Sequence, residues 1–560
     1  MGNENGSGNN FQACYDAAKR LDPRPVHHES TRDGKEYGGN RFSDMYSKMY
    51  PGMDWMDKYV NSFDKPMFIC EYAHSMGNAI GNLKEYWESI ESSTTTVGGA
   101  IWDWVDQAIY EPHEIFAGTY QGRLRTGYDF PGPHQGNFCS NGIITADRKP
   151  TPKLAQVKAV QAWIKFELVG VDAKANTATI KVKNTYDFIN TEGHELRFEL
   201  VKNGEFVSYW SQPLPVIEVD GETEIVLPLN VVNLKQAIKA GDEIMLNIRA
   251  TQQFATVWSA AGHEVASAQF ELNARKATLP TIKVDKKAEK LAVEDTEKTL
   301  KVGNKAIAAE FCKETGVMTS LKFNGHEIIN GKEGFMYDNY RFIENDRSCK
   351  PGNGLDSVGT CEIVPSKGGS VIVKTTRGGK LASQVITYTF LPNGTVDMDV
   401  TLTPQAKELR RAGLVASIVP GLRNVNYWAY GPDENYNDRK ESCMVGRYQT
   451  TVDDMVVYYQ KPQSMGGREG LRELVMTNAK GQGFRIETQG EVSFSALPYT
   501  DMQLAKANHM YELRKDHFIT LHIDGKYRGV GNASCGPDTM HKYKIVEDSY
   551  NFKLRLSAVK

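Results

Sequence analysis

Three side chains that can exchange protons stand close together near residue 71. An apolar run at residues 67–70 predicts a buried β-strand, and Glu71, Tyr72 and His74 follow where that strand should end. In a parallel α/β barrel, the chemistry takes place at the carboxyl ends of the strands. The spacing therefore predicts a reaction site at the end of this strand.

The neighbouring segments repeat an order of strand and helix. Apolar residues return at the spacing of one helix face directly after this strand, at Ile80, Leu83, Trp87 and Ile90. A second apolar run at residues 98–101 then ends in Trp102-Asp103-Trp104. This alternation predicts βαβ units and favours part of a (β/α)8 barrel.

The first 110 residues hold about half of the strands that such a barrel needs. Strands are predicted at residues 26–28, 42–46, 67–70 and 97–102, and helices at residues 11–21 and from Pro51 onward. A closed barrel has eight strands, so the segment corresponds to the later half of one. His27, His28 and Glu29 are not expected to bind one metal ion, because adjacent side chains on a strand point to opposite faces.

From about residue 165 the pattern changes to antiparallel strands. Leu196, Phe198 and Leu200 alternate with polar residues before Asn203-Gly204, a strong hairpin signal, which predicts an Ig-like sandwich. A larger β-sandwich is predicted from about residue 300. Its signals are the alternating Val396, Met398, Val400 and Leu402, and the turns Asn324-Gly325, Asn393-Gly394 and Asp524-Gly525.

Composition excludes several classes of protein. The chain has 66 basic and 69 acidic side chains among 560 residues, a formal net charge of −3, which argues against nucleic acid or a membrane surface as a partner. No apolar run approaches the ~20 residues that span a bilayer. The eight cysteines show no metal-ligand spacing and are interpreted as mostly buried thiols. Residues 1–10 carry no apolar stretch typical of a signal peptide, which leaves both a cytoplasmic and a periplasmic location open.

Four motifs, in order along nearly the whole chain, resemble one known family. They are residues 70–78 (CEYAHSMGN), 102–107 (WDWVDQ), 138–142 (FCSNG) with 146–148 (ADR), and 431–439 (GPDENYNDR). This set is similar to the large five-domain bacterial β-galactosidases of glycoside hydrolase family 2. The predicted fold class is multidomain α/β plus all-β. The expected domains are a partial TIM barrel at residues 1–155, an Ig-like sandwich at 160–275, a linker or edge strand at 276–300, and a large galactose-mutarotase-like sandwich at 301–560.

The resemblance implies the two carboxylates of a retaining glycosidase. Gly2-Asn3-Glu4 matches the motif of the family's acid/base, which would be Glu4, and Glu71 matches its nucleophile. Retaining enzymes hold two carboxyl groups about 5–5.5 Å apart. All barrel strands end at one mouth, so the two glutamates can meet there.

Further roles are implied by the same resemblance. Tyr46 matches a tyrosine that hydrogen-bonds the nucleophile. Asn3, His74, Trp102 and Asn141 match residues that contact the sugar, with Trp102 as an apolar floor under the ring and Trp104 as a packing residue. The family's sodium would be held by the Phe138 carbonyl and the Asn141 side chain, and its magnesium by Glu4 with two further ligands upstream in the family.

Each of these residue types also has a structural use. A strand-end glutamate such as Glu71 can form a salt bridge, Tyr46 and His74 can be structural hydrogen-bonding groups, and Glu4 can be a solvated residue of a terminal segment. Only the motifs favour the catalytic interpretation for these residues.

The chain also departs from the family pattern. The resemblance begins three residues before the acid/base, so we expect an N-terminally truncated form that is weakly active or inactive by itself. Cys535 stands where the best-known member has an aromatic residue that stacks on the aglycone. Because the loss of this aromatic face affects the aglycone more than the galactose, we expect a β-galactoside in general, rather than lactose in particular, as the substrate. Family membership implies a homo-oligomer. The alternatives are another family 2 glycosidase, namely a β-glucuronidase or a β-mannosidase, and a non-catalytic sugar-binding or scaffolding protein.

Overall fold

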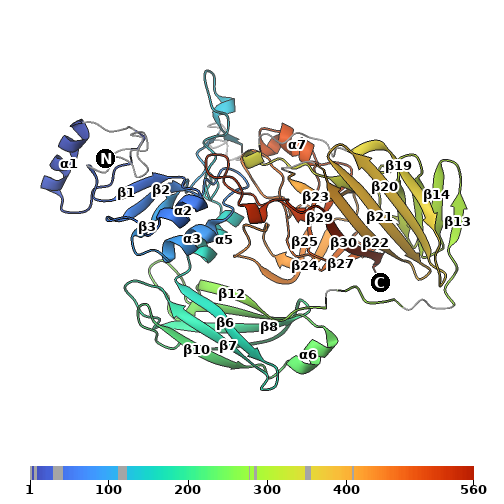
Figure 1. The fold of residues 1–560 in the computed structure, drawn as a ribbon, viewed down its shortest axis with the longest axis horizontal. Helices are drawn as coiled ribbons and strands as arrows, with labels where there is room; N and C mark the ends of the chain where they lie inside the picture. Colours follow the sequence, from blue (N-terminus) through green and yellow to red (C-terminus); the bar gives the residue numbers. More distant parts are fainter. Residues whose placement is uncertain are drawn as a thin grey trace.

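The computed structural model describes residues 3–4, 9–29, 42–110, 123–276, 278–282, 287–346, 355–405 and 409–559. Buried apolar side chains form three main clusters that follow one another along the chain, from residue 56 to 160, from 162 to 272, and from 300 to 556. Figure 1 shows the three corresponding parts of the chain. The first cluster lies in an α/β part and the other two in antiparallel sheets. The predicted combination of α/β and all-β structure is confirmed, whereas the domain boundaries stay predictions.

The α/β part is built on a parallel sheet of three strands in the order β1-β2-β3. These strands are β1 (Tyr46–Met49), β2 (Met67–Tyr72) and β3 (Thr96–Ile101). The helices are α1 (Asn9–Leu21), α2 (Met53–Tyr59), α3 (Leu83–Glu91) and α5 (Pro152–Val160), and the two short strands β4 (Ile109–Tyr110) and β5 (Leu124–Arg125) pair with each other. Apolar side chains of α2, α3 and α5 pack with those of β2 in one core. No helix among the described residues is long and apolar enough to cross a membrane.

Two of the four strands predicted in this part are confirmed, those at residues 67–70 and 97–102. The strand predicted at 42–46 begins at Tyr46 instead, and residues 25–29 form no regular element. The Val26 segment bonds to Ser43 and Asp44 rather than to a strand: its N–H donates to the Asp44 carboxylate at 2.8 Å, and its carbonyl accepts from the Ser43 hydroxyl at 3.1 Å and from the Asp44 N–H at 2.9 Å. Local side-chain bonds of this kind compete with a sheet ladder.

The second unit is a sandwich of two antiparallel sheets, ordered β10-β7-β6 and β12-β11-β8-β9. Its strands are β6 (Ile164–Asp172), β7 (Thr177–Asn184), β8 (His194–Lys202), β9 (Glu205–Pro213), β10 (Glu222–Pro228), β11 (Ile244–Gln252) and β12 (Glu264–Asn273), with the short helix α6 (Leu234–Ala240). The predicted hairpin at Asn203-Gly204 joins β8 to β9, and both residues have positive φ, 52° and 80°. Two positive φ angles are the signature of the tight turn that suits twisted strands.

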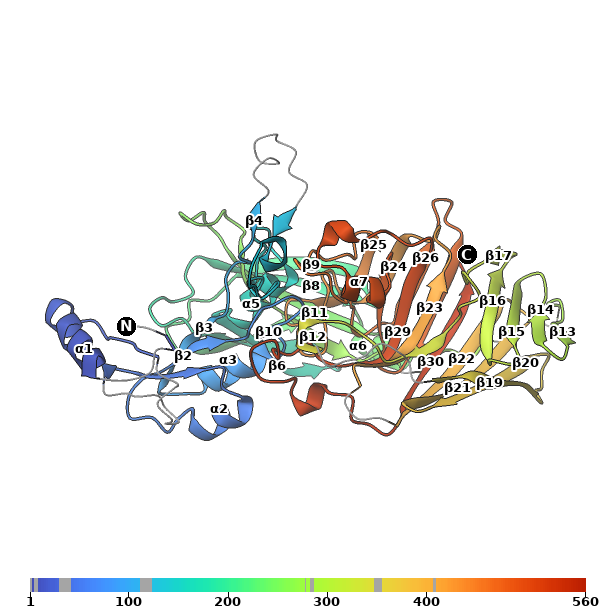
Figure 2. The same cartoon turned by 90° about the horizontal axis from the view of Figure 1, so that it is seen from above.

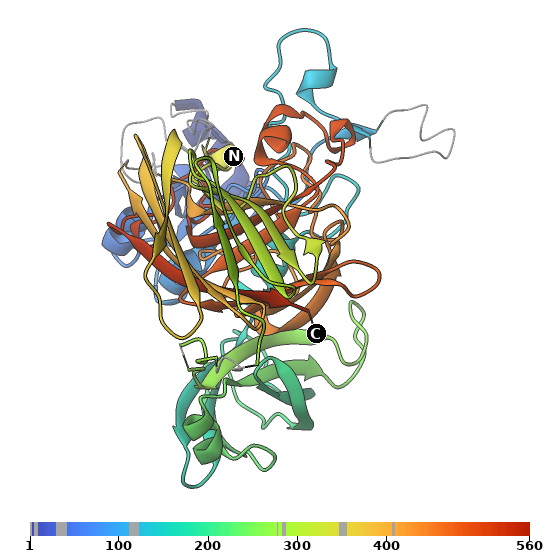
Figure 3. The same ribbon diagram turned by 90° about the vertical axis from the view of Figure 1, so that its right-hand side faces the viewer.

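The third unit is a large sandwich whose strands run from β13 to β30 (Figure 2). They are β13 (Ala292–Asp295), β14 (Thr299–Gly303), β15 (Ile307–Cys312), β16 (Val317–Phe323), β17 (His326–Glu327), β18 (Met336–Asp338), β19 (Leu355–Val364), β20 (Val371–Gly379), β21 (Ala382–Leu391), β22 (Thr395–Pro404), β23 (Arg411–Ile418), β24 (Asn424–Gly431), β25 (Met444–Thr451), β26 (Glu473–Thr477), β27 (Gly483–Gln489), β28 (Ser493–Leu497), β29 (Ile519–Tyr527) and β30 (Tyr550–Ala558), with helix α7 (Asp501–Lys506). The sheets are β19-β20-β21-β22-β30-β27-β26-β24-β25, β18-β23-β29-β28 and β13-β14-β15-β16-β17. Figure 3 shows the second unit lying against one side of this sandwich.

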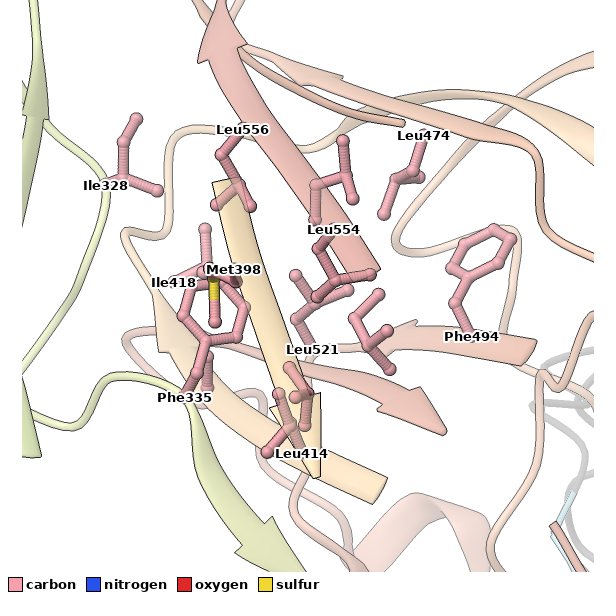
Figure 4. Close-up of a cluster of buried hydrophobic side chains, with 14 of the residues drawn as sticks. Ile328, Phe335, Met398, Leu414, Ile418, Leu474, Phe494, Leu521, Leu554 and Leu556 are labelled. Carbon is pink, nitrogen blue, oxygen red and sulfur yellow. The ribbon is translucent and has the colours of Figure 1, made fainter. Parts of the chain in front are cut away.

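The core of the large sandwich follows the predicted alternation. Val396, Met398, Val400 and Leu402 of β22 are all fully buried. Figure 4 shows Met398 packed among Leu414, Ile418 and Phe335, with Leu554 and Leu556 of β30 beside them. Side chains two apart on a strand share a face, so every second residue of β22 and β30 enters the core.

Three expectations about this part of the chain need correction or completion. The hairpin predicted at Asp524-Gly525 is wrong, because both residues lie inside β29, where an irregularity in the pairing faces Ala412 and Gly413. The charged tract near residue 290 holds the edge strand β13, while residues 277 and 283–286 lie outside the described residues. Most described cysteines are at least partly exposed rather than buried; only Cys361 and Cys443 are buried, and Cys349 lies outside the described residues.

Candidate functional site

Glu71 lies at the carboxyl end of β2, the central strand of the parallel sheet. Strand alternation places it on the same face as Met67 and Ile69, and only 9% of its surface is exposed. Its carboxylate accepts a hydrogen bond from the Asn3 side-chain amide at 2.9 Å. The sequence-predicted reaction site at this strand end is therefore a buried carboxylate held by a partner more than sixty positions away in the chain.

The tyrosine beside Glu71 is Tyr50, and the assignment of Tyr46 to this position is wrong. Tyr50 directly follows β1; its N–H donates to the Glu71 carbonyl at 2.7 Å, and its hydroxyl hydrogen-bonds the Glu71 carboxylate. Tyr46 starts the same strand opposite Met67, and its hydroxyl donates to Asp64 at 2.7 Å. Because β1 and β2 are parallel, Tyr46 lies at the amino end of the sheet, away from the strand ends where Glu71 stands.

The environment of Glu71 favours its protonated form more than water does. Burial raises the pKa of Glu71, hydrogen bonds from Tyr50 and Asn3 lower it, and the negative charges of Glu4 and Glu29 raise it further. The pKa of Tyr50 is raised as well, by burial first and then by the charge of Glu71. Donors on two sides therefore stabilise the ionised carboxylate against burial and like charge.

Asn3 and Glu4 meet Glu71 from the other side of the site. Both side chains are exposed, and the Glu4 N–H donates to the carboxylate of the buried Glu29 at 3.1 Å. Glu4 has a positive φ of 52°, a conformation that is uncommon for a residue other than glycine. Gly2 of the same motif lies outside the described residues. The structure thus brings Asn3 into contact with Glu71 and places the charge of Glu4 within its electrostatic reach.

His74 forms a second wall of the site and is fully buried. Its Nδ1 lies 2.7 Å from the Ser534 hydroxyl, which comes from the loop after β29 in the large sandwich. Its ring stacks on Phe138 at a centroid distance of 5.5 Å and meets the edge of Tyr50 at 5.9 Å. Cys535, next to Ser534, hydrogen-bonds with the hydroxyl of Tyr50. The large sandwich therefore supplies two side chains to the neighbourhood of Glu71.

Trp102 directly follows β3 and lies on the adjacent loop. Its N–H donates to the Tyr72 carbonyl at 3.0 Å, its own carbonyl accepts from Ser75, and 36% of its surface is exposed. The indole is accessible to a ligand, as an apolar floor for a sugar ring requires. Trp104, expected to pack in the interior, is 57% exposed, because it lies on the loop beyond the strand.

Phe138 and Asn141 lie close enough to serve as two ligands of one monovalent cation. The Asn141 amide donates to the Phe138 carbonyl at 3.1 Å, and the Asn141 Oδ1 is buried without a hydrogen-bond partner among the described residues. A carbonyl and an unsatisfied amide oxygen are the hard donors that a cation such as sodium prefers. The residues present therefore fit part of a sodium site.

The described part of the chain offers no set of ligands that would complete a magnesium site at Glu4. One group of three potential ligands is found there, Asp338, Asp501 and His522 in the large sandwich. The Arg411 guanidinium already bonds these carboxylates, at 3.0 Å from Asp338 and 3.2 Å from Asp501. In that group the Arg411 side chain already supplies the positive charge that a metal ion would bring, so we interpret it as a charge cluster rather than as a metal site.

Sequence reasoning missed Tyr50, Ser534 and Lys153, a fully buried residue of α5 that lies below this site. For Tyr50 the sequence does hold a signal: Pro51 follows it, and a strand that starts at Tyr46 ends before this proline. Tyr50 is therefore the residue at the strand end. Ser534 carried no such signal, because its partner His74 lies 460 positions away in the chain.

Three family models match successive parts of the chain. They are described as "Glycosyl hydrolases family 2, TIM barrel domain" over residues 1–166, "Beta-galactosidase, domain 4" over residues 180–273, and "Beta galactosidase small chain" over residues 303–556. Together they cover the α/β part and both sandwiches.

Curated relatives match over nearly all of this chain. A protein named beta-galactosidase from Priestia megaterium is 32% identical over 95% of this chain and 51% of its own length. Proteins of the same name from Actinobacillus pleuropneumoniae and Lactococcus lactis are 27% and 28% identical over 99% of this chain, and over 54% and 57% of their own lengths. The chain thus spans about half the length of these relatives.

Among solved structures, a putative aldose 1-epimerase from Escherichia coli K12 is 10% identical over 48% of this chain and 99% of its own, with a TM-score of 0.27. This score is too low to assign a shared fold. The likeness of the large sandwich to galactose mutarotase stays a prediction.

Proposed function

We propose that this chain, which matches three family models of glycoside hydrolase family 2 and β-galactosidase and is similar to proteins named beta-galactosidase, carries the site for retaining hydrolysis of terminal β-D-galactosides. The observation that carries this proposal is the placement of Glu71: a buried carboxylate at a strand end, bonded by Asn3 and Tyr50 and within electrostatic reach of Glu4. Two carboxyl groups facing one site are what double displacement requires.

In the proposed reaction, the Glu71 carboxylate attacks the anomeric carbon and the bond to the leaving oxygen breaks. Glu4 gives its proton to that oxygen, so a galactosyl ester of Glu71 and the free alcohol are formed. Glu4 then takes a proton from water, and the water oxygen displaces Glu71 from the anomeric carbon. The product is galactose with the original β configuration, and both glutamates return to their starting states.

The walls of the site support the galactosyl ring in this proposal. Trp102 is accessible and would offer an apolar face to the ring, while polar contacts would come from His74, which packs against Tyr50, and from Asn141, which bonds the Phe138 carbonyl. The Tyr50 hydroxyl would keep Glu71 ionised and oriented. A sodium ion held by Phe138 and Asn141 would add positive charge for a sugar hydroxyl; the magnesium assigned to Glu4 rests on the family resemblance alone.

We further propose that this chain by itself hydrolyses galactosides slowly. Asn3 and Glu4 are exposed, and the bonds found for their segment are those from Asn3 to Glu71 and from Glu4 to Glu29. An acid/base group needs to be held within about 0.5 Å of its productive position. The resemblance also supports a homo-oligomer, which light scattering would measure.

The test is turnover of nitrophenyl β-galactoside by the purified chain, with the anomer of the first product identified by NMR. We expect slow hydrolysis that releases β-galactose, and lower activity on the matching β-glucuronide and β-mannoside. Release of α-galactose, or a preference for either of the other two glycosides, would overturn the proposal. Binding of galactose without any turnover would favour a sugar-binding protein.

A further inference from the structure

A buried lysine lies directly beneath the residues that would contact the sugar. Lys153, near the start of α5, is only 2% exposed. Its ammonium donates to the Ser75 carbonyl at 2.6 Å and to the Gly142 carbonyl at 2.5 Å. Ser75 directly follows His74, and Gly142 directly follows Asn141. One cation therefore joins the loop after β2 to the turn that carries the Phe138 and Asn141 oxygens.

The two residues that Lys153 contacts are each fixed a second time. The Ser75 N–H donates to the Trp102 carbonyl at 2.7 Å, which ties the same point to the loop after β3. The Gly142 N–H donates to the buried carboxylate of Asp106 at 2.7 Å. Lys153 thus bonds the loops that carry His74 and Asn141 directly, and it is linked through Ser75 to the loop that carries Trp102.

The space around Gly142 leaves little room for these loops to shift. A Cβ atom at this position would come within 2.0 Å of the Asp106 backbone nitrogen. The backbone of the turn is therefore packed directly against the segment after Trp104. Loss of the Lys153 bonds would therefore strain the turn and this segment together, because close-packed interiors transmit strain.

The charges around Lys153 come from both the α/β part and the large sandwich. Asp106 and Glu434 are the negative groups that face it, and Arg439 is a positive one. Burial lowers the pKa of Lys153 to about 8, and the charge of Asp106 opposes this. Its ammonium also lies 5.8 Å from the ring centre of Tyr459. A buried ammonium is costly unless its hydrogen bonds are made, and two carbonyls meet that requirement here.

We propose that Lys153 is a positioning residue for galactoside binding: its ammonium sets the relative placement of His74, Trp102 and Asn141 without touching the substrate. This inference rests on the proposed function and deepens it, because it names the group that holds the sugar-binding wall together.

The test compares Lys153→Met with Lys158→Met in the full chain. Methionine keeps much of the volume of the lysine stem but donates no hydrogen bond, whereas Lys158 is an exposed residue of the same helix. We expect Lys153→Met to raise KM on the order of 10-fold and to lower kcat by a similar factor, because small misplacements of binding groups are costly. Lys158→Met should leave both constants unchanged.

The KM separates positioning from a loss of folded protein. A variant that merely unfolds in part lowers the apparent kcat but keeps the KM of the folded fraction, and circular dichroism reports that fraction. Lys153→Gln serves where Lys153→Met fails to fold, since its amide can still donate, and it should give an intermediate KM.

Two results would count against the inference in different ways. An unchanged KM in both Lys153 variants, with an active wild-type chain, would overturn the role of Lys153 alone. Absence of turnover and of galactose binding in the wild-type chain and in Lys158→Met would overturn the proposed function and the Lys153 inference with it.

Discussion

The two sides of the candidate site differ in the burial of their residues and in the number of contacts that hold them. On one side, Glu71 lies in a strand of the parallel sheet and Tyr50 and His74 follow strand ends, and the large sandwich contacts His74 through Ser534 and Tyr50 through Cys535. On the other side, Asn3 and Glu4 are exposed. The Glu71 side is held by buried residues of the sheet and of the large sandwich, while the Glu4 side depends on two hydrogen bonds among the described residues.

This difference bears on the two steps of the proposed reaction. Glu71 is buried beside donors that favour its ionised form, so attack on the anomeric carbon is supported by fixed groups. Proton transfer from Glu4 relies on a side chain open to solvent. We therefore expect changes on the first side to abolish the chemistry, and changes on the second to alter its dependence on the leaving group.

The largest effect is expected for Glu71→Gln. It removes the only group assigned to attack the sugar, so kcat should fall on the order of 10⁴-fold or more. The assay is hydrolysis of nitrophenyl β-galactoside, with Glu88→Gln on the exposed face of α3 as control. Residual activity within tenfold of the wild-type chain would rule out Glu71 as nucleophile.

Glu4→Gln should show a loss that depends on the leaving group. Without the acid, galactosides of poor leaving groups should react about 100-fold more slowly, whereas dinitrophenyl galactoside, which needs no protonation, should form the glycosyl-enzyme at a nearly unchanged rate. Pre-steady-state release of the phenol measures this step. Equal losses for both substrates would remove Glu4 from the acid role.

Tyr50→Phe and Tyr46→Phe form a matched pair. The first removes a hydroxyl that bonds Glu71. The second removes the hydroxyl of Tyr46, which starts β1 at the other end of the sheet and bonds Asp64. We expect kcat to fall about 10- to 100-fold for Tyr50→Phe and to stay within twofold for Tyr46→Phe. The reverse order would restore the assignment of Tyr46 that the structure contradicts.

Ser534→Ala tests the contribution of the large sandwich to the site. The change removes the hydroxyl that meets His74 at 2.7 Å, so KM should rise about threefold to tenfold as the imidazole loses its orientation. Ser366→Ala, on an exposed turn of the same sandwich, is the control. If both variants have the KM of the wild-type chain, the hydrogen bond between Ser534 and His74 does not contribute to substrate binding.

The smallest effect is a shift of the acid limb of the pH profile of kcat/KM. Burial raises the pKa of Glu71, and only the ionised form attacks, so activity should fall as the pH drops through this raised pKa. Asn3→Ala and Tyr50→Phe each remove a bond that lowers the pKa, so each should move the limb to higher pH. A limb that moves to lower pH would contradict the proposed environment.

The same shift has a consequence for stability. A carboxyl group whose pKa is higher in the folded than in the unfolded chain binds protons more tightly when folded, so its contribution to stability is lost as the pH rises through the folded pKa. Glu71→Gln stays neutral at every pH and should therefore unfold at a higher temperature than the wild-type chain near pH 7. Calorimetry over a pH series should show this gain growing as the pH rises through the raised pKa of Glu71.

Much of the site could be predicted from local patterns. Glu71 and Trp102 directly follow apolar runs, His74 stands three positions after Glu71, and the ends of parallel strands are where side chains converge. The alternation in β22 gave the core of the large sandwich for the same kind of reason, since the period of two decides which side chains are buried.

Other features could not be predicted because they depend on distant partners or on strand ends. The resemblance assigned the tyrosine beside the nucleophile to Tyr46, the last residue of the strand predicted at 42–46; the observed β1 runs from Tyr46 to Met49, so Tyr50 is the residue that follows the strand. Ser534 and Lys153 act on loops far away in the chain, and no local pattern encodes such contacts. At Asp524-Gly525, a hairpin signal was overridden because the buried Asp524 carboxylate pairs with Arg411 at 3.1 Å inside the sheet.

The most direct test of this account is to trap the glycosyl-enzyme with 2-deoxy-2-fluoro-β-galactosyl fluoride and to locate the adduct by peptide mass spectrometry. The fluorine slows both steps, while the good leaving group lets the first proceed without the acid. The account predicts one galactosyl adduct, on Glu71, that is absent in Glu71→Gln and retained in Glu4→Gln. An adduct on any other residue of the wild-type chain would contradict the assignment of Glu71 as the nucleophile.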